Sequence, residues 1–588
     1  MYDSGRSRSY HPGRRPLAVS YKGGTVFQSR SLFQSFWVRH CQGKGASAVV
    51  RSVAVVKSSG YFGQLRFKKD TAAMRSVCLA VLAMTLTLVR GQADLTRVPG
   101  TMGADVVEAT LLQIRESCVF PSDSLFLRRA AYVMTKDGTD PNTYRAGFDG
   151  GIWQVNQTDF AMTKSSPAVS MYWAPIKAAF NIDWAGVQWS DLRKPLYSGI
   201  AAMLTLLRVS GGSIPRLQER QAAFWQNNFF PEDSRAAYDF LTQTQNLDSS
   251  CASNSLDMAF IVDSSTSLAP EDFERAKQFA SDVTGQFRVS PNDVRVAFVT
   301  YSSGYRADFD FQRYTSTPDV QRAIMAVKKV EGGTDTHLAL KYAADNLFTT
   351  QVPLGKRFST FGGGTAGSRV SAARVVIIIT DGKSVDKIDA EVSFCLIRLW
   401  GQSLSATLGV PDLSNVGRIV LSTAEDTEEG VGNQVDTQEL NNLASSPSCT
   451  HVQELQQYSE LDSLKTEIKE LSCKALVSLD TGIYTYPCGQ RNNFQVNPAA
   501  VRSIVVRPTS GTVRVYGSHV NAQPNDALKD FVTVATTTKA AVIYVTDATR
   551  PLYLSIQSDY TKPGECVTDY QIDVVPFNAL NKGRPAFL

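Results

Sequence analysis

Three oxygen-bearing side chains at alternating positions follow a short apolar run near the middle of the chain. Residues 258–262 read Met-Ala-Phe-Ile-Val, and Asp263, Ser265 and Ser267 come directly after them in the pattern D-x-S-x-S. An uninterrupted apolar run of this length is typical of a strand buried on both faces of a parallel sheet. Open α/β sheets bind their ligands at the carboxyl ends of such strands. One carboxylate and two hydroxyls at that edge are hard donors, which suit a hard divalent cation.

Two later stretches add further oxygen donors. Thr334 lies in a glycine-rich turn after Gly332 and Gly333, and a second apolar run at 375–380 ends in Asp381. The order of D-x-S-x-S, a threonine turn and a strand followed by Asp-Gly resembles the metal-ion-dependent adhesion site of von Willebrand factor type A domains. The resemblance implies a doubly wound, Rossmann-like α/β domain at 248–474. It also implies that a divalent ion, Mg²⁺ with Mn²⁺ or Ca²⁺ as alternatives, is held by Asp263, Ser265, Ser267, Thr334 and Asp381.

This ligand set has a consequence for binding. Only two of the five donors carry charge, and the five together leave a position on the ion open. The resemblance therefore implies an extracellular adhesion or matrix protein. Its partner would be a protein ligand, such as a collagen-like or other matrix protein, that supplies a carboxylate. A final helix with an apolar stripe of Leu461, Leu464, Ile468 and Leu471 is expected to close the domain.

Charge is unevenly distributed along the 588 residues, which are too many for one core and predict several domains. The net charge is +5, but residues 1–75 carry 14 Lys and Arg against 2 Asp and Glu. The remainder is acidic, with 46 basic and 53 acidic residues. The basicity therefore belongs to a head at 1–73 whose composition predicts disorder, and nucleic-acid binding is not expected.

The end of this head resembles a secretory signal peptide at 74–93. Met74 and Arg75 precede a 13-residue apolar run at 77–89, and small residues follow up to Ala93. We expect translation to begin at Met74 and the product to be secreted and extracellular, without stable membrane insertion. The rival interpretation is a basic cytoplasmic tail on a signal anchor, which the shortness of the apolar run disfavours.

Seven of the nine cysteines follow the signal segment, at 118, 251, 395, 449, 473, 488 and 566. An extracellular chain is expected to pair most of them. Some relatives of the type A family are clasped by a bond like one between Cys251 and Cys473, and Cys488 and Cys566 bracket the C-terminal region. Cys395 falls in 394–420, which has no family counterpart, so no native partner is expected for it. Asn156 begins the sequon Asn-Gln-Thr and is a predicted glycosylation site.

Residues 94–247 predict a helical domain, with helices at 106–114, 125–134 and 197–208. The helix segment 131–135 and the glycine turn at 150–156 together resemble the lysozyme and lytic-transglycosylase fold. Met134 occupies the position of that family's general-acid glutamate, and a thioether cannot protonate a leaving oxygen. No catalytic residue is therefore predicted.

The resemblance to lysozyme still implies a saccharide-binding cleft lined by Tyr144, Trp153 and Gln154. Two other interpretations stay open. One is a secreted glycosidase in which another carboxylate, such as Glu116, acts. The other is a plain helical domain whose tryptophans, at 153, 173, 184, 189 and 225, lie in the core.

The last region, 475–588, changes character. Short Val- and Tyr-rich segments alternate with Pro, Gly, Asp and Asn turns, which predicts a β-sandwich. No catalytic constellation occurs in it. A matrix component that binds polysaccharide through the helical region and protein through the α/β domain is therefore a further interpretation of the whole chain.

Overall fold

The structure is a computed structural model. It describes residues 55–58, 61–64, 93–245, 247, 255–348, 367–369, 371–381, 417–423, 437–485, 491–498, 501–547, 549–558 and 569–576. The chain divides into two units, 1–83 and 84–588. The predicted signal segment, except for its last residue, lies outside the described residues, as do Cys251, Cys395, Cys488 and Cys566.

The first unit contains one described hairpin. Strand β1 (Val55–Ser58) pairs antiparallel with β2 (Tyr61–Gln64), with Val56 opposite Gly63. The disorder predicted for 1–73 stays a prediction.

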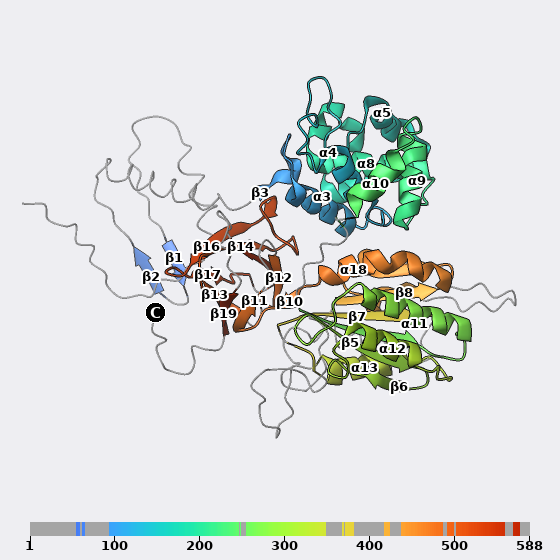
Figure 1. The fold of residues 1–588 in the computed structure, drawn as a ribbon. Helices are drawn as coiled ribbons and strands as arrows, with labels where there is room; N and C mark the ends of the chain where they lie inside the picture. Colours follow the sequence, from blue (N-terminus) through green and yellow to red (C-terminus); the bar gives the residue numbers. More distant parts are fainter. Residues whose placement is uncertain are drawn as a thin grey trace, which may run out of the picture. The chain divides into compact units, whose positions relative to one another are not determined.

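The helical prediction for the start of the second unit is confirmed. The elements are η1 (Leu95–Arg97), α3 (Ala104–Glu116), α4 (Phe126–Thr135), α5 (Gln157–Ser165), α6 (Pro167–Ser170), α7 (Trp173–Phe180), η2 (Trp184–Gly186), η3 (Trp189–Arg193), α8 (Pro195–Ser210), α9 (Gln218–Phe229) and α10 (Ala236–Thr244). Helix α8 is apolar almost all round, and its side chains from Leu196 to Leu207 are mostly buried. Because such a helix must be surrounded, the other helices pack around it (Figure 1).

A six-stranded sheet forms the centre of the second region. Its strands are β4 (Leu256–Asp263), β5 (Val294–Tyr301), β6 (Tyr305–Phe309), β7 (Ala373–Thr380), β8 (Gly417–Thr423) and β9 (Val452–Leu455), in the order β6-β5-β4-β7-β8-β9. All neighbours are parallel except β5 and β6. Strand β8 lies between β7 and β9 and is parallel to both.

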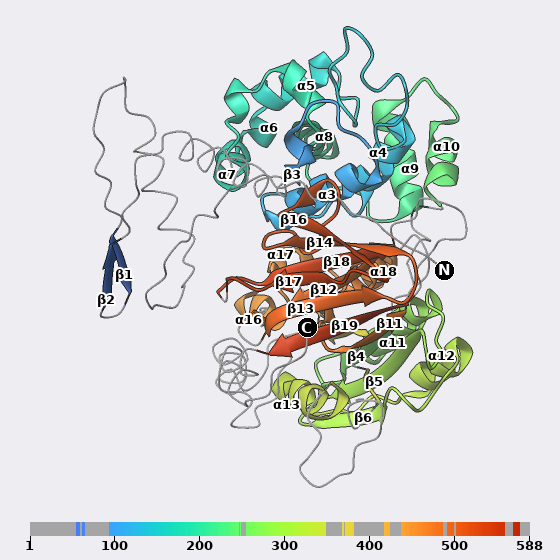
Figure 2. The same ribbon diagram turned by 90° about the vertical axis from the view of Figure 1, so that its left-hand side faces the viewer.

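Helices cover both faces of this sheet because β4 is buried on both. Met258 and Phe260 pack in a cluster with α11 (Pro270–Gly285), α12 (Thr317–Ala326), η5 (Tyr458–Leu464) and α18 (Lys465–Cys473). Ala259 and Ile261 pack on the other side with α13 (Thr336–Tyr342), η4 (Ala343–Leu347) and α16 (Thr437–Leu443). The arrangement is an α/β layer structure with helices on two sides (Figure 2).

The C-terminal strands form two sheets. One has the order β10-β12-β18-β14-β16 and the other β11-β19-β13-β17. The strands are β10 (Val477–Ser478), β11 (Gly482–Thr485), β12 (Arg491–Val496), β13 (Val501–Pro508), β14 (Thr512–Ser518), β16 (Phe531–Thr536), β17 (Ala541–Tyr544), β18 (Leu552–Ser558) and β19 (Asp569–Pro576). The sheets pack together: the Asn492 amide donates to the Tyr570 hydroxyl at 2.7 Å, and the rings of Phe494 and Tyr484 meet edge to face.

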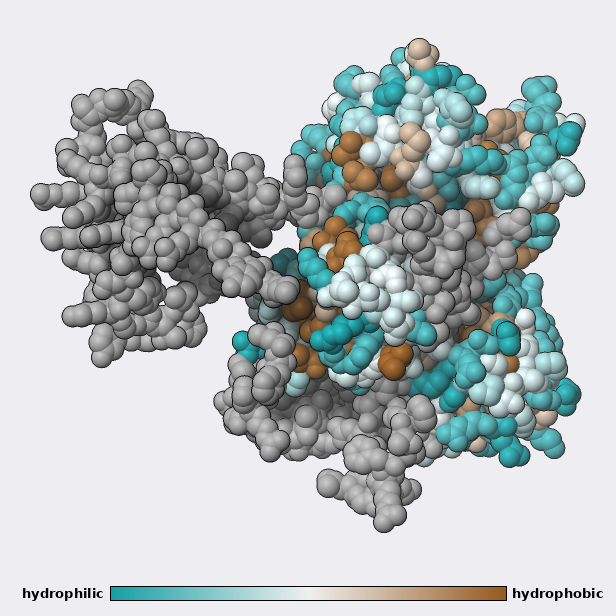
Figure 3. Space-filling model, turned by 60° about the vertical axis from the view of Figure 1, so that its left-hand side comes forward, coloured by the Kyte–Doolittle hydropathy of each residue, from teal (hydrophilic) through white to brown (hydrophobic). Residues whose placement is uncertain are grey.

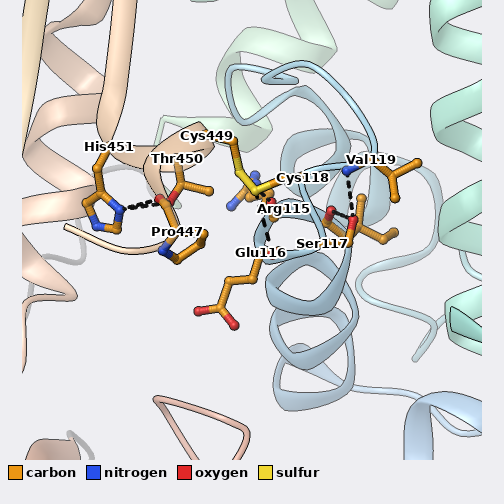
Figure 4. The surroundings of a disulfide bond; sticks show 10 residues. Arg115, Glu116, Ser117, Cys118, Val119, Pro447, Cys449, Thr450 and His451 are labelled. Atoms are coloured by element: carbon orange, nitrogen blue, oxygen red, sulfur yellow. Dashed lines mark hydrogen bonds between the residues drawn. A yellow bond between two sulfur atoms is a disulfide. The ribbon is translucent and has the colours of Figure 1, made fainter. Parts of the chain in front are cut away.

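The helical region is fastened to both of its neighbours. Strand β3 (Ala93–Asp94) pairs with β15 (Leu528–Lys529) beside the C-terminal sheets. Cys118, after α3, forms a disulfide bond with Cys449 in α17 (Ser448–His451), across 331 residues of sequence (Figure 4). Cys473 is also disulfide-bonded, and its predicted partner Cys251 lies outside the described residues.

On the face drawn in Figure 3, the described surface is largely hydrophilic, with scattered apolar patches. Within the described ranges, no helix combines the length and the apolar character needed to cross a membrane.

Candidate metal centre

The residues of the D-x-S-x-S motif lie where β4 ends. Asp263 is the last residue of the strand and is fully buried, Ser265 is 1% exposed, and Ser267 is exposed. The Ser265 backbone N–H donates to Asp263 Oδ1 at 2.8 Å, and this hydrogen bond orients the carboxylate. The hydroxyls of Ser265 and Ser267 are 2.9 Å apart and hydrogen-bonded. The spacing therefore brings all three oxygen donors to one strand end, as predicted from the sequence.

Asp381 meets this group from the neighbouring strand. Strands β4 and β7 are parallel, with Val262 opposite Ile379, so the residues after them reach the same edge. The Thr380 hydroxyl donates to Asp263 Oδ2 at 3.3 Å. Oδ1 of Asp381 is buried and accepts no hydrogen bond. A buried carboxylate oxygen without a donor is costly, so it marks a place where a cation fits.

The negative charge of each carboxylate makes the ionised form of the other less favourable. Burial, and then the negative charge of Asp381, raise the pKa of Asp263 to about 7, although hydrogen bonds from Ser265 lower it. No Lys or Arg within the described ranges forms an ion pair with either carboxylate. A divalent cation among hard oxygen donors would remove this repulsion, so the residues present fit the ion that the motif implies.

The threonine turn lies against the same loop. Thr334 is 8% exposed and precedes α13. The Thr266 backbone N–H donates to the Gly332 carbonyl at 3.0 Å, and the Gly332 N–H donates to the Thr266 hydroxyl at 3.0 Å. The Asp335 N–H donates to the Ser302 carbonyl at 2.8 Å. Thr334 itself makes no hydrogen bond to either carboxylate in the described structure, so its place in the ligand set rests on the turn's position.

Three further residues shape the site and were not singled out from the sequence. Ser264, the unassigned position of the motif, donates from its hydroxyl to the Val330 carbonyl at 2.8 Å. The ammonium of Lys329 donates to the Ser265 carbonyl at 2.7 Å. Tyr301 ends β5 opposite Asp263 and is 1% exposed. The sequence signal that could have identified Tyr301 is its position as the last residue of a predicted strand that ends at the same sheet edge.

Comparison with known proteins bears directly on this site. Residues 257–467 match the family model described as von Willebrand factor type A domain. These residues form a von Willebrand factor type A domain. The match contains the whole predicted metal set, and the sheet order and two-sided helix cover are those of an α/β domain.

The curated relatives include matrilins. Matrilin-3 of Gallus gallus is 28% identical over 228 residues, which cover 39% of this chain and 42% of that protein. Matrilin-1 of Homo sapiens is 28% identical over 258 residues, which cover 42% of this chain and 45% of that protein. The chain spans less than half the length of these relatives.

One solved structure among the matches is the proximal thread matrix protein 1 from the mussel byssus, with a zinc-occupied MIDAS motif. It is 21% identical and covers 41% of this chain and 52% of that chain, with a TM-score of 0.29. At that TM-score the overlap is too limited for the two sites to be compared.

The lysozyme resemblance of the helical region has no support among these matches. The family match begins at residue 257, beyond the predicted boundary at 247. Met134, at the position of the family's general acid, packs against the helical core. The expected saccharide cleft also differs from the structure, since Trp153 is 3% exposed and its indole N–H donates to the Leu127 carbonyl at 2.8 Å.

The other two cleft residues are bound by their own loop. The Gln154 amide donates to the carbonyls of Thr143 and Gly151 at 3.0 and 2.7 Å. The Tyr144 hydroxyl donates to the Thr101 carbonyl at 2.8 Å. These contacts hold the glycine turn in place, and the burial of Trp153 agrees with the plain helical interpretation, which placed the tryptophans in the core. Trp184 and Trp225 are likewise buried.

Asn156 is exposed, as a glycosylation site must be. Its side-chain oxygen accepts from the Asp159 N–H at 2.8 Å and caps the first turn of α5. Glycosylation at Asn156 stays a prediction.

Proposed function

We propose that this chain is an extracellular matrix or adhesion protein whose type A domain binds a carboxylate of a protein ligand through a divalent cation. The observation that carries the proposal is the pair Asp263 and Asp381, which lie together at the sheet edge and form no ion pair with a Lys or Arg among the described residues. Mg²⁺ is the proposed ion, with Mn²⁺ and Ca²⁺ as alternatives. The proposal assigns binding, and not catalysis, to this site.

Each residue of the set has a distinct task. Asp263 and Asp381 supply the negative charge, and the hydroxyls of Ser265, Ser267 and Thr334 supply neutral donors. The Ser265 N–H orients Asp263 before any ion arrives. A divalent ion in this set would supply a Lewis-acidic position that a partner's Glu or Asp can fill, because five donors leave one position of a six-coordinate ion open.

Two sequence features and one structural feature support an extracellular setting for this binding. Residues 74–93 resemble a secretory signal peptide, and Asn156 begins a sequon on an exposed helix cap. Cys118 and Cys449 are joined in a disulfide bond, which forms and persists in oxidising compartments. A collagen-like or other matrix protein is the partner class that these features and the metal site favour together.

Solid-phase binding of the full chain to immobilised matrix proteins, with fibrillar collagen first, tests the proposal. We expect binding in Mg²⁺ that EDTA abolishes and that Asp263→Ala reduces at least roughly tenfold, because the variant loses one of two charged ligands. Asp345→Asn is the matched control, since Asp345 only pairs with Lys341 on the surface of the domain. Binding that persists in EDTA, or in Asp263→Ala, contradicts the proposal.

A further inference from the structure

A cleft separate from the metal centre lies where the helical region, the β8–β9 side of the type A domain and the C-terminal strands meet. Its volume is about 1120 Å³, and α3, α17, α18, β12 and β18 all contribute to its walls. Ligand pockets typically occupy about 300–1,000 Å³ and often lie between domains. The cleft is therefore large enough for a small molecule or a peptide side chain.

Acidic side chains outnumber basic ones in this cleft. Five carboxylates and three Lys or Arg side chains line it. Most of these charges are already paired: Lys474 forms ion pairs with Glu108 at 3.2 Å and with Glu470, and Arg115 pairs with Asp123 at 3.1 Å. Burial lowers the pKa of His451, which favours its neutral form, so it does not offset the acidic excess.

Glu116 is the exception among these acids. It lies in the last turn of α3, and its carboxylate points away from the helix into the space beside the Cys118–Cys449 bond (Figure 4). In the part of the chain that the structure describes, it has neither an ion pair nor a side-chain hydrogen bond. Burial raises the pKa of Glu116 to about 7, because no cation offsets the cost of its charge.

An aromatic side chain stands near Glu116. Tyr553 on β18 also lines the cleft, and after burial the charge of Glu116 is what raises the pKa of its phenol. A carboxylate and an aromatic ring that share a cleft can bind one cation together. The carboxylate accepts charge-assisted hydrogen bonds, and the ring face attracts the positive charge.

We propose that this cleft binds an organic cation, with its primary ammonium or guanidinium group held by Glu116 and beside the Tyr553 ring. A lysine or arginine side chain of a peptide and a free polyamine share this chemistry. A bound cation would pair with the carboxylate of Glu116. It would also offset the excess of acidic over basic side chains that line the cleft. The proposal is independent of the metal centre, since none of the five predicted metal ligands lines the cleft.

Isothermal titration of the full chain tests the proposal at pH 8, where Glu116 is mostly ionised and aliphatic amines are protonated. The two probes are Nα-acetyl-lysine amide, whose side-chain ammonium is free, for a peptide side chain, and spermidine, for a free polyamine. We expect saturable binding of at least one probe. Glu116→Gln should weaken it roughly tenfold or more, as loss of a charge-assisted hydrogen bond does. Tyr553→Leu should weaken it a few-fold, while Tyr553→Phe, which keeps the ring, should bind as the wild type does.

Glu219→Gln in α9 is the control, because Glu219 is an acidic helix residue that does not line the cleft. Thermal melts show whether each variant keeps its fold. Stronger binding of the lysine probe identifies a peptide source, and stronger binding of spermidine a polyamine. The proposal is overturned if neither probe binds the wild type, or if folded Glu116→Gln binds them equally well.

Discussion

Gly332 holds the threonine turn against the D-x-S-x-S loop in a conformation that only glycine adopts easily. Its φ is +147°, and a Cβ there would lie 2.7 Å from the Ser303 hydroxyl oxygen. We predict that Gly332→Ala shifts the Thr334 turn and weakens Mg²⁺ binding roughly tenfold, since strain of this kind costs about 1–3 kcal/mol. Gly304→Ala is the matched control, because a Cβ at Gly304 has nothing within 4 Å. Calorimetric Mg²⁺ titration of both variants decides it, and equal affinities would show that the turn does not belong to the site.

Arg369 stabilises the other end of β4, where the strand begins. Asp257 is fully buried, and its Oδ1 accepts from Arg369 Nη2 at 2.7 Å. The same guanidinium donates to the carbonyls of Leu256 and Asp293 at 3.0 and 2.8 Å. Removing this side chain takes the ion-pair partner from a buried carboxylate, which keeps only the Arg369 backbone N–H as a donor from that residue. It also removes a donor from the carbonyls of Leu256 and Asp293.

We therefore predict that Arg369→Ala lowers the free energy of unfolding of the type A domain by about 3–5 kcal/mol. Urea unfolding of the full chain, followed by the signal of this domain, measures the loss. Arg322→Ala serves as comparison, because Arg322 is 76% exposed and pairs with Asp319 on the surface, where such pairs contribute about 1 kcal/mol or less. A loss for Arg369→Ala as small as that for Arg322→Ala would mean that the pair is not needed for stability.

At the scale of elements, α3 and α18 are joined by charge. Glu108 on α3 pairs with Lys474 at the end of α18 and with Arg128 on α4. Partial burial works against its charge, but Lys474, Arg128 and Arg115 together lower the pKa of Glu108 to about 2 from an ordinary 4.5. A folded-state pKa below that of the unfolded chain stabilises the fold above pH 4.5, and this contribution disappears as the pH falls towards about 2.

Glu108→Gln should therefore be less stable than the wild type at neutral pH and should lose that difference between about pH 4.5 and 2. Thermal melts of both proteins over this pH range measure it. A difference that stays constant across the range would show that the charge of Glu108 does not hold the two helices together.

The elements themselves could largely be predicted from sequence, whereas their distant contacts could not. The apolar runs at 258–262 and 375–380 are buried on both faces, so their composition alone indicates β4 and β7, and the residues after them share one sheet edge. Trp153 shows the limit of such reasoning. Its position in a glycine turn suggested a ligand, yet only the packing of α4 and α8 around it determines that it is core.

At the scale of the whole molecule, the Cys118–Cys449 bond could not be predicted either, because nothing local links two cysteines separated by 331 residues. The bond ties the helical region to the α17 segment beside β9. The cleft around Glu116 depends on the same long-range contact. Its lining residues come from three regions, and no single motif contains them.

We predict that Cys449→Ser lowers the stability of the folded chain by about 2–5 kcal/mol, as removal of a bond that closes a long loop does. Differential scanning calorimetry should then show the helical region and the type A domain unfolding at lower or separate temperatures. Ser448→Ala, next to the cysteine on the same short helix, is the control. An unchanged calorimetric profile for Cys449→Ser would mean that the noncovalent contacts between α3 and α18 suffice.

The most direct test of the central claim is calorimetric titration of Mg²⁺ into the full chain, compared with Asp263→Asn and Asp381→Asn. The account predicts saturable binding at one site that either substitution weakens at least roughly tenfold, because each removes one of two charged ligands. It also predicts that, in EDTA, the Asn variants are at least as stable as the wild type, since they relieve the repulsion between two uncompensated carboxylates. Unchanged Mg²⁺ affinity in both variants, or variants that are markedly less stable in EDTA, would contradict it.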